Sequence, residues 1–581
     1  MKQVLEEQLH QAVNAFLAER NIVLGDDCAP EIERTRDSRH GDFASNIALS
    51  LARTAGMKPR DIAQAIIERL PDSGLVDKVE IAGPGFINFF LDQSAYLQLV
   101  PEILAAGEMY GSSEYGKGRR VLVEFVSANP TGPLHIGHGR GAAYGATVAD
   151  VLAAAGYEVT REYYVNDAGR QVDILALSTW LRYLSTCGVD VPYPEKAYQG
   201  HYIRDIATRL HEQSGAAYRV DPEGLYDVLG EAEGEKQLDD GIAYARKALG
   251  NDKFTAIGKL VLQEILDEIR TDLEEFGVSF DNWFSEQSLI DGNAVQGCLE
   301  ELRRRDDIYE KDGAQWFRSS RYGDEKDRVV VRENGQTTYF ASDIAYHINK
   351  FDRGYNLAID VWGADHHGYI DRVRGALQSL GQDDSHLQIL LVQFATLYRG
   401  SEKLPMSTRS GDYVTLRDLR NEVGNDAARF FYVTRKSEQH LDFDMELAVS
   451  QSSDNPVYYI QYAHARICSV MRQMLERGYE FDQDAMIANI ALLVESHEQS
   501  ILRSLSRYPE VILTAARGCE PHLIAFYLRD LATDFHTYYN SHQFLVEEQG
   551  LRQSRLGLIL AVRQVIKNGL KLLGVSAPEE M

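Results

Sequence analysis

Two histidines, His135 and His138, lie three residues apart at the point where a long helix is expected to begin. An apolar run at residues 121–126 predicts a buried strand, a loop rich in proline and glycine follows it, and the helix is expected through residues 140–155. Residues three apart share one face of a helix, and a helix start presents unpaired amides with a partial positive charge. Two imidazoles in that place are suited to holding a polyanion such as the phosphates of a nucleotide.

One carboxylate, Glu124, lies inside the run Val-Leu-Val-Glu-Phe-Val, which is otherwise apolar on both faces and therefore predicts a central strand. A buried carboxylate is costly without a partner, and a guanidinium, which is planar and bidentate, is the best match for it. Two partners stay open at this point: a guanidinium ligand, or a protein arginine such as Arg140 or Arg161.

The string Glu-Phe-Val-Ser-Ala-Asn-Pro-Thr-Gly-Pro-Leu-His-Ile-Gly-His, from Glu124 to His138, contains what resembles the first signature of class I aminoacyl-tRNA synthetases, and in full it resembles the arginyl members. The resemblance covers essentially the whole chain. It implies a ligase that activates L-arginine with ATP and Mg²⁺ and transfers it to tRNA(Arg), with activation expected only when tRNA is present. It also implies that His135, Gly137 and His138 are catalytic: the histidines contact ATP and stabilise charge on the phosphorus, and the glycine lets the adenine approach the backbone.

The resemblance further implies a site for the amino acid. Glu124 and Asp343, with Tyr339 beside them, match contacts to the substrate side chain. Ser127 and Asn129 match contacts to its α-amino and carboxylate groups. Two carboxylates would also discriminate against neutral analogues such as citrulline, which would leave the charge of the site unpaired.

A second junction between a strand and a helix, residues 360–368, contains Gly363, Asp365 and His366, for which the resemblance implies contacts to ATP. A glycine there lets the nucleoside lie against the backbone, and an aspartate can accept hydrogen bonds from ribose hydroxyls. His366 and His367 alone would suggest a metal pair. Adjacent residues on one helix turn point apart and no third ligand is evident, so no structural metal is expected.

The second class I signature, Lys-Met-Ser-Lys-Ser, is degenerate at its expected position. Met406 and Ser407 remain and are expected at the catalytic centre, but Pro405 replaces the first lysine and Thr408 replaces the second. The second lysine normally steadies the phosphates of the transition state, so another cation is needed. The sequence leaves three candidates open: Lys117, Lys403 and Arg409.

A chain of 581 residues is several domains long, and 44% hydrophobic residues support packed cores. Pattern and resemblance together predict a multidomain α/β protein. It has a Rossmann-like parallel-sheet catalytic domain with a helical insertion, a small α+β N-terminal domain that contacts tRNA, and an all-α C-terminal anticodon-binding domain. The expected ranges are 1–109 for the N-terminal domain, 110–190 and 291–448 for the two halves of the catalytic fold, 191–290 for the insertion and 449–581 for the C-terminal domain.

A net charge of −27 argues on its own against a nucleic-acid partner. Between residues 551 and 578, however, five basic residues occur without an acidic one: Arg552, Arg555, Arg563, Lys567 and Lys571. They form either a phosphate-binding strip or an ordinary solvated helix face. The resemblance implies tRNA contacts by Tyr459, Arg466 and Arg563, although any single tyrosine of this helical region suits helix packing better.

The five cysteines are scattered, with neither a disulfide pattern nor zinc spacing, which fits a reducing compartment. The first residues predict a charged amphipathic helix, not a signal peptide, and no apolar run approaches transmembrane length. A cytoplasmic protein is expected, and a monomer is the default of the family.

Two other functions compete with this interpretation. The glycine run after His138 suggests a dinucleotide-binding oxidoreductase, but it lies too far behind its strand and its third glycine is one place late. The degenerate second signature suggests a tRNA-binding protein that has lost catalysis, against which the intact first signature and Glu124 speak. Arginine-dependent exchange of pyrophosphate into ATP would discriminate between the two classes.

Overall fold

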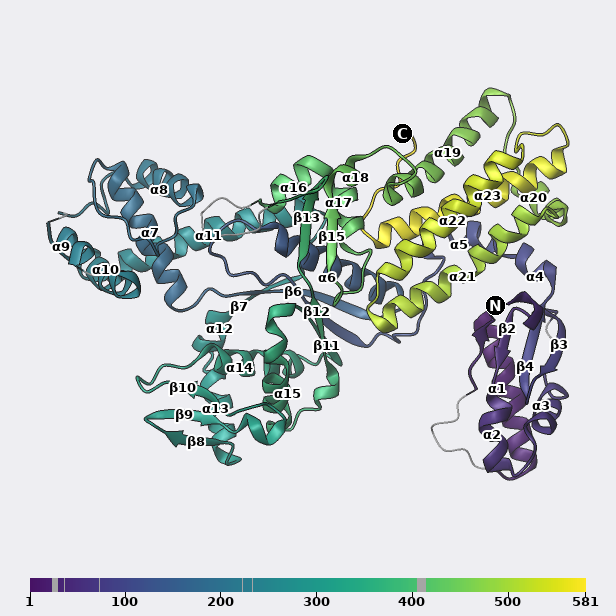
Figure 1. Ribbon diagram of the computed structural model, residues 1–581, viewed down its shortest axis with the longest axis horizontal. Coiled ribbons are helices and arrows are strands. Elements are labelled where there is room, and N and C mark those ends of the chain that lie inside the picture. Colours follow the sequence, from purple (N-terminus) through teal and green to yellow (C-terminus); the bar gives the residue numbers. More distant parts are fainter. Residues whose placement is uncertain (23–29, 36, 73, 222, 232, 405–413) are drawn as a thin grey trace.

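The computed structural model describes residues 1–22, 30–35, 37–72, 74–221, 223–231, 233–404 and 414–581. Four parts are visible in Figure 1: a small N-terminal domain, a catalytic domain with a parallel sheet, a helical lobe inserted into that domain, and a C-terminal bundle of helices. The predicted fold class is confirmed. In the described part of the chain, no helix is both long enough and apolar enough to cross a membrane.

Five parallel strands form the central sheet in the order β12-β11-β5-β6-β7. They are β5 (Arg120–Glu124), β6 (Glu158–Val165), β7 (Asn282–Ser285), β11 (Leu357–Gly363) and β12 (Leu387–Val392). The middle strand, β5, is covered on both faces, which explains its nearly unbroken apolar run. Val121 and Val123 pack in the cluster of helix α6 (Ile136–Ala154), whereas the carboxylate of Glu124 meets helix α14 (Tyr339–Asp352) on the other face.

The strand ends two residues earlier than the apolar run predicts. Val126 and Ser127 have φ angles of 67° and 39°, a left-handed conformation that is unusual for any side chain and especially for a β-branched one. The resulting reversal returns the Ser127 hydroxyl to Glu124, with 2.9 Å between Oγ and Oε1. The strain therefore lies at the edge of the sheet where ligands of α/β folds bind.

The inserted lobe has a hydrophobic core of its own, built around Trp180, Leu177 and Ile257. Its helices are α7 (Arg170–Thr186), α8 (His201–Ser214), α9 (Glu223–Glu231), α10 (Gly234–Leu249) and α11 (Asn251–Glu275). The lobe thus begins earlier than the expected boundary at 191, because α7 already packs in this core. It also ends earlier than 290, because β7 belongs to the central sheet.

A second, smaller insertion was not expected from the sequence. It contains α12 (Glu286–Asp291), α13 (Ala294–Arg304) and an antiparallel sheet of β8 (Ile308–Lys311), β9 (Ala314–Phe317) and β10 (Arg328–Val331). Its core is shared with α14 and with α15 (Ile370–Ser379), so these elements together cover one face of the central sheet. The short helix η4 (Ala364–Tyr369) connects β11 to α15.

A three-stranded sheet follows the central one, with β13 (Ala395–Arg399) between β14 (Glu402–Lys403) and β15 (Leu441–Asp444). Its helices are α16 (Leu416–Val423), α17 (Asn425–Tyr432) and α18 (Met445–Val449). The buried guanidinium of Arg140 on α6 donates to the backbone carbonyls of Gln393, Lys436 and Gln439, at 2.7 to 2.8 Å. These bonds hold α6, the helix that begins at the signature histidines, against the β12–β13 connection and the segment before β15.

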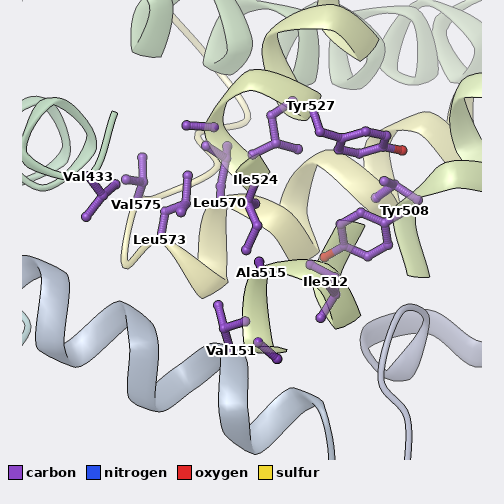
Figure 2. Packing of buried hydrophobic residues seen from close by; sticks show 14 of the residues in the cluster. Val151, Val433, Tyr508, Ile512, Ala515, Ile524, Tyr527, Leu570, Leu573 and Val575 are labelled. Carbon is purple, nitrogen blue, oxygen red and sulfur yellow. The ribbon is translucent and has the colours of Figure 1, made fainter. Parts of the chain in front are cut away.

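Five helices form the C-terminal bundle: α19 (Pro456–Glu476), α20 (Gln483–Asn489), α21 (Ser496–Gly518), α22 (His522–Ser541) and α23 (Gln549–Leu572). Figure 2 shows how its core continues into the catalytic domain, because Val151 of α6 and Val433 lie beside Ala515, Leu573 and Val575. The bundle and the catalytic domain therefore share one hydrophobic core instead of being joined by a linker.

The N-terminal domain carries an antiparallel sheet in the order β1-β2-β4-β3. Its elements are α1 (Lys2–Glu19), β1 (Glu33–Arg34), β2 (Phe43–Ser45), α2 (Ile47–Ala55), α3 (Pro59–Ile67), β3 (Val76–Ala82) and β4 (Phe86–Leu91), and α4 (Gln93–Leu97) and α5 (Leu99–Ala106) follow it. Arg34 fastens the domain to the C-terminal bundle through Glu510 and Ser506 on α21.

Candidate active site

A pocket of about 330 Å³ opens at the carboxyl ends of the central strands, the edge where open α/β sheets bind ligands. It brings together side chains from β5, β6, β11, α7, α12, α14 and α15 that are far apart in the sequence. All five residues predicted to contact the amino acid line it: Glu124, Ser127, Asn129, Tyr339 and Asp343. Gly363 and His366, predicted to contact ATP, line it as well.

The carboxylate of Glu124 is not free inside this pocket. Its Oε2 accepts from Nζ of the buried Lys350 at 2.6 Å, and its Oε1 accepts from the Ser127 hydroxyl at 2.9 Å. The cation beside Glu124 is therefore Lys350, and neither of the arginines considered from the sequence takes this place. Arg140 binds backbone carbonyls, and Arg161 binds Asp150.

Lys350 is shared with a second carboxylate, Asp360, whose Oδ1 lies 2.6 Å from Nζ. Asp360 and Glu124 are direct neighbours on adjacent parallel strands, so without the lysine two like charges would lie side by side. The remaining oxygen of Asp360 meets Nε2 of His347 at 2.9 Å, and Nδ1 of that ring meets the Asp343 carbonyl at 2.7 Å. Both ring nitrogens of His347 therefore face oxygen atoms, so the ring is held between the Asp360 carboxylate and the backbone of α14.

Asp343 stands in a different environment. Burial raises the pKa of its carboxyl to about 7, an effect that His347 opposes and that Glu286 and Glu124 reinforce. Among the described residues, no hydrogen bond to its carboxylate oxygens occurs. Asp343 is therefore the predicted carboxylate that a cationic ligand can approach.

Ser127 and Asn129 both have engaged side chains. The Ser127 hydroxyl donates to Glu124 and accepts from the backbone amide of Tyr164 at 3.0 Å. The Asn129 carbonyl oxygen accepts from the Asn166 amide at 3.1 Å. Ser127 consequently orders the end of β5 around Glu124, and Asn129 contacts the end of β6 at the pocket wall.

The signature histidines cap their own helix. Nδ1 of His135 accepts from the amide of Gly137 at 3.0 Å, and Nδ1 of His138 accepts from the amide of His135 at 3.3 Å. Burial lowers the pKa of His135, and burial together with the His135 ring lowers the pKa of His138 to about 3. Both rings are therefore neutral at pH 7, and each carries its proton on Nε2 as a hydrogen-bond donor.

The two rings are stacked, with 3.7 Å between their centroids. Gly137 permits this arrangement, since a Cβ at this position would lie 2.7 Å from Cε1 of His135. The glycine was expected to make room for the adenine. The contact seen in the structure is with the histidine ring, so a side chain at residue 137 would displace that imidazole.

The second signature loop begins and ends beside the first signature. Before it, Leu404 pairs with Leu397 of β13, and after it, Val414 and Leu416 pair with Ile136 and Leu134 through backbone bonds of 3.2 and 2.8 Å. Met406, Ser407 and Arg409 lie outside the described residues. Lys403 is exposed in β14, at the entry to this loop.

Lys117 is not brought to the site. The amides of Gly116 and Gly118 donate to the carbonyls of Ala155 and Gly156, so the loop between them lies at the carboxyl end of α6. A helix of 19 residues separates it from the histidines, which is roughly 28 Å. Lys117 and the histidines therefore lie at opposite ends of α6.

The remaining predicted nucleotide contacts surround the end of β11. Gly363 is its last residue, and a Cβ there would lie 2.5 Å from the Asp365 carboxylate. Asp365 and His366 are exposed on η4, with 3.8 Å between the Asp365 carboxylate and Nε2 of His366. Within the described ranges, no group of three or more His, Cys, Asp or Glu side chains could hold a metal ion.

Three family models match the chain. They are the arginyl-tRNA synthetase N-terminal domain over residues 3–91, the class I (R) tRNA synthetase catalytic domain over residues 99–467, and the DALR anticodon-binding domain over residues 460–581. The catalytic model alone spans more than half of the chain. The chain belongs to the arginyl-tRNA synthetases.

The arginine–tRNA ligase of Thioalkalivibrio sulfidiphilus is 60% identical over the full length of both chains, and that of Hydrogenovibrio crunogenus is 55% identical, also over the full length of both. The solved arginyl-tRNA synthetase of Thermus thermophilus superimposes with a TM-score of 0.75 at 24% identity and full coverage of both chains, which supports the fold. The resemblance read from the sequence is thus confirmed: the enzyme is an arginine–tRNA ligase of class I.

The residues expected to contact tRNA lie in three different settings on the bundle of this synthetase. Tyr459 lines an open pocket between α17, α19 and α22, together with Arg435, Phe526 and Arg529. Arg466 packs on the Tyr462 ring, with 4.4 Å from its Cζ to the ring centroid. Arg563 is half-buried on α23, near Cys468.

The expected basic strip on α23 is mostly structural. Arg555 is buried against Glu498 at 2.9 Å, and Arg552 donates to the carbonyls of Val546 and Glu547. Lys571 pairs with Glu108, so it joins α23 to the end of the N-terminal region. Arg552 and Arg555 therefore belong to the packing of the bundle, whereas Lys567 and Lys571 are exposed.

Sequence reasoning missed several side chains of the synthetase pocket. Two of them are buried acceptors that have no partner among the described residues: Gln171 Oε1 and Glu286 Oε2. Lys350 was missed as well, although a helical spacing of four and seven places it on the face of α14 that carries Asp343 and His347. That spacing was the sequence pattern that could have identified Lys350, whereas no sequence pattern identified Glu286.

Proposed function

We propose that L-arginine binds in the pocket at the carboxyl edge of β5, with its guanidinium toward Asp343 and Tyr339 and its carboxylate toward the stacked histidines. The observation that supports this is the convergence on one pocket of the five side chains for which the family resemblance implies contacts to arginine. Asp343, whose carboxylate accepts no hydrogen bond from the described residues, lies on α14. The loop that connects to α6 and its histidines begins at the end of β5.

In the first step, the arginine carboxylate attacks the α-phosphate of ATP, an O–P bond forms, and pyrophosphate leaves. This step needs alignment of two anions and stabilisation of charge on a five-coordinate phosphorus. The neutral rings of His135 and His138 supply Nε2–H donors for that charge, and they need no proton transfer to do so. In the second step, the 3′ end of tRNA(Arg) takes the arginyl group and releases AMP.

ATP is proposed to lie along the end of β11, with the nucleoside against Gly363 and with Asp365 and His366 beside it. The described residues offer no protein-built metal site, so Mg²⁺ fits as a companion of the ATP phosphates and not as a protein-held ion. Lys403, at the entry to the second signature loop, and Arg409, within it, remain the candidates for the missing lysine. K403A and R409A should be compared for the rate of adenylate formation.

The tRNA is proposed to contact the C-terminal bundle through Tyr459, Arg466 and Arg563. Tyr459 is the best placed of the three, because it lines a pocket with two arginines and an exposed phenylalanine, and such pairs of aromatic and cationic side chains suit unstacked bases. We also propose that arginine activation requires bound tRNA, that the enzyme is a monomer, and that it works in the cytoplasm.

The decisive experiment is arginine-dependent exchange of pyrophosphate into ATP, measured with and without tRNA(Arg). Exchange is expected only with tRNA. D343N should raise the KM for arginine strongly, while D291N, an exposed substitution on α12, should behave as the wild type. Exchange that is absent in both conditions would favour a tRNA-binding protein without catalysis, and a normal KM for D343N would remove the pocket assignment.

A further inference from the structure

One helix, α11, connects the inserted lobe to the catalytic domain. Its first half packs in the core of the lobe, where Phe254 and Ile257 are buried, and its second half packs in the main core, where Ile265 and Ile269 are buried. Figure 1 shows α11 between the other helices of the lobe and α16, the helix that follows the second signature loop. Because a helix is rigid, its two halves couple the positions of the two cores.

Two arginines of α16 bind the last turns of α11. Nε of Arg417 donates to Oδ1 of Asp272 at 2.7 Å, and its Nη2 lies 3.2 Å from Oε1 of Glu268. One turn further along α16, Arg420 donates to the Asp272 carbonyl at 3.2 Å and pairs with the carboxylate of Glu275. A guanidinium suits such a place because it presents several donors in a fixed fork. The start of α16 is therefore fastened to α11 by two cations and three carboxylates.

Asp272 is the buried member of this contact. The residue is 1% exposed, whereas 43% of the Arg417 side chain is exposed. In the described part of the chain, Arg417 is the only cation paired with this carboxylate, and Oδ2 of Asp272 has no hydrogen-bond partner there. A buried carboxylate that loses its only cation is strongly destabilising. A shift of α16 would leave the charge of Asp272 uncompensated, so the pair favours one position of α16 on α11.

The segment that leads into α16 also holds the first signature. Backbone bonds of 2.8 and 3.2 Å join residues 414–416 to residues 134–136 in an antiparallel bridge, with His135 at its centre. The side chains of this contact are close as well, since a Cβ on Gly139 of α6 would lie 2.9 Å from Cδ1 of Leu416. The backbone on both sides of the N-cap histidine is therefore fixed by the segment whose helix is fastened to α11.

We propose that Arg417 and Asp272 are positioning residues for arginine activation: through them, the inserted lobe holds residues 414–416 and, with them, the imidazole of His135. This inference rests on the proposed role of His135 as a hydrogen-bond donor to the reacting phosphate. Neither Arg417 nor Asp272 lines the arginine pocket, so the pair acts on the rate of the phosphate step and not on the affinity for arginine. Alignment is the main requirement of that step, and a displacement of about 1 Å can lower a rate by about 100-fold.

The test is a double-mutant cycle between Arg417 and His135, with tRNA(Arg) present. The rate constant of pyrophosphate release in the first turnover is measured at saturating arginine and ATP, where it does not depend on the fraction of folded enzyme. R417M should lower this rate constant by about 10- to 100-fold and leave the half-saturating concentration of arginine unchanged. In the H135N background, R417M should cause no further loss, because both changes remove the same alignment.

R209M is the matched control. Arg209 pairs with Glu264 of α11 at 2.8 Å, and 46% of its side chain is exposed, but this pair joins α11 to α8 and not to α16. R209M should leave the rate constant unchanged in both backgrounds. R417K keeps a cation beside Asp272 and should recover most of the rate. D272N, which keeps the shape of the buried side chain, tests the same pair from α11 and should slow the reaction in the same direction as R417M.

Three results would overturn the proposal. If R417M lowers the free energy of unfolding in urea but not the rate constant, Arg417 is a structural residue only. If the losses caused by R417M and H135N multiply, Arg417 affects the reaction by a route that does not include His135. If R209M slows the reaction as much as R417M does, the effect belongs to the lobe in general. A failure of the proposed role of His135 would be seen separately, because H135N alone would then be as fast as the wild type.

Discussion

At the scale of single residues, the signature histidines act as neutral donors and not as cations. Each Nδ1 caps a backbone amide at the start of α6, so the protonated nitrogen is Nε2 in both rings. Burial lowers the pKa of His138 to about 3, so this ring is neutral at pH 7. The phosphate recognition proposed above would therefore depend on hydrogen-bond geometry that the helix start fixes in advance.

Two substitutions separate the capping role of His135 from its donor role. H135N keeps an acceptor at the N-cap, so the free energy of unfolding should stay within about 0.5 kcal/mol of wild type, but kcat for activation should fall by about 10² to 10³. H135A should lose the same activity and also about 1 kcal/mol of stability. Urea unfolding and tRNA-dependent pyrophosphate exchange measure the two effects. An active H135N enzyme would show that Nε2 is not used.

The raised pKa of Asp343 predicts that arginine binding depends on pH. In the free enzyme this pKa is about 7, and a guanidinium favours the ionised carboxylate, so the pKa falls in the complex. The affinity for arginine should therefore be highest above pH 7. It should decrease as the pH falls through 7, by at most about tenfold per pH unit. Calorimetry in buffers of different ionisation enthalpy should show proton release near pH 7. D343N should show none, and release by D343N would assign the proton to another group.

At the scale of secondary-structure elements, α14 explains how two strands and a helix share one charge network. Asp343, His347 and Lys350 lie on one face of this helix, which covers the ends of β5 and β11. The neighbouring carboxylates Glu124 and Asp360 would repel each other across the two strands, and Lys350 lies between them. The helix therefore both positions Asp343 for the ligand and stabilises the middle of the sheet.

K350M should destabilise the protein strongly, since it leaves two buried carboxylates without their cation. Removal of one partner from a buried ion pair costs about 3 to 5 kcal/mol, so a large drop in the urea midpoint is expected. K326M, at an exposed lysine of the small insertion, is the control and should leave the midpoint unchanged. If K350M unfolds at the same urea concentration as K326M, the network contributes nothing to stability.

The elements show how far local patterns predict this structure. The apolar run around Glu124 predicted the middle strand, and the residues after it predicted the loop and helix, because burial on both faces is visible in composition. The partner of Glu124 was not predictable in the same way. Lys350 lies 226 residues away, and only the packing of α14 on the sheet brings it there. The prediction for Lys117 failed for a related reason: it is near the signature in sequence, but a strand and a full helix separate it from the histidines.

At the scale of the whole molecule, three arginines join parts that are distant in the chain. Arg34 links the N-terminal domain to α21, and Arg140 links α6 to the segment before β15. Arg429 of α17 is buried and donates to the carbonyl of Leu573 at the end of α23 and to those of Phe276 and Gly277 after α11. The catalytic domain, the inserted lobe and the bundle thus meet at one guanidinium.

Domain organisation was predictable from sequence where hydrophobic cores are separate, and less so where they merge. The inserted lobe has its own core, and helical periodicity predicted it. Its bounds differ from the predicted ones because α7 belongs to the lobe and β7 to the central sheet. The bundle shares its core with α6, so no change of composition marks the junction (Figure 2). The small insertion with β8, β9 and β10 was missed because its strands have only four residues each.

Arg429 provides the test of whether the joined parts unfold as one unit. Burial lowers its pKa to about 10, so it is still a cation at pH 7, and R429M would leave three buried carbonyls without a donor. Each unsatisfied carbonyl costs about 1 to 3 kcal/mol, so R429M should lose about 3 kcal/mol or more. Because one lost bond joins the catalytic domain to the bundle and the other two join it to the end of the inserted lobe, the single thermal transition expected for wild type should separate into two. R435M, at an exposed arginine six residues further along, is the matched control. Differential scanning calorimetry that finds one transition for R429M, at the temperature of R435M, would show that the shared hydrophobic core alone couples the domains.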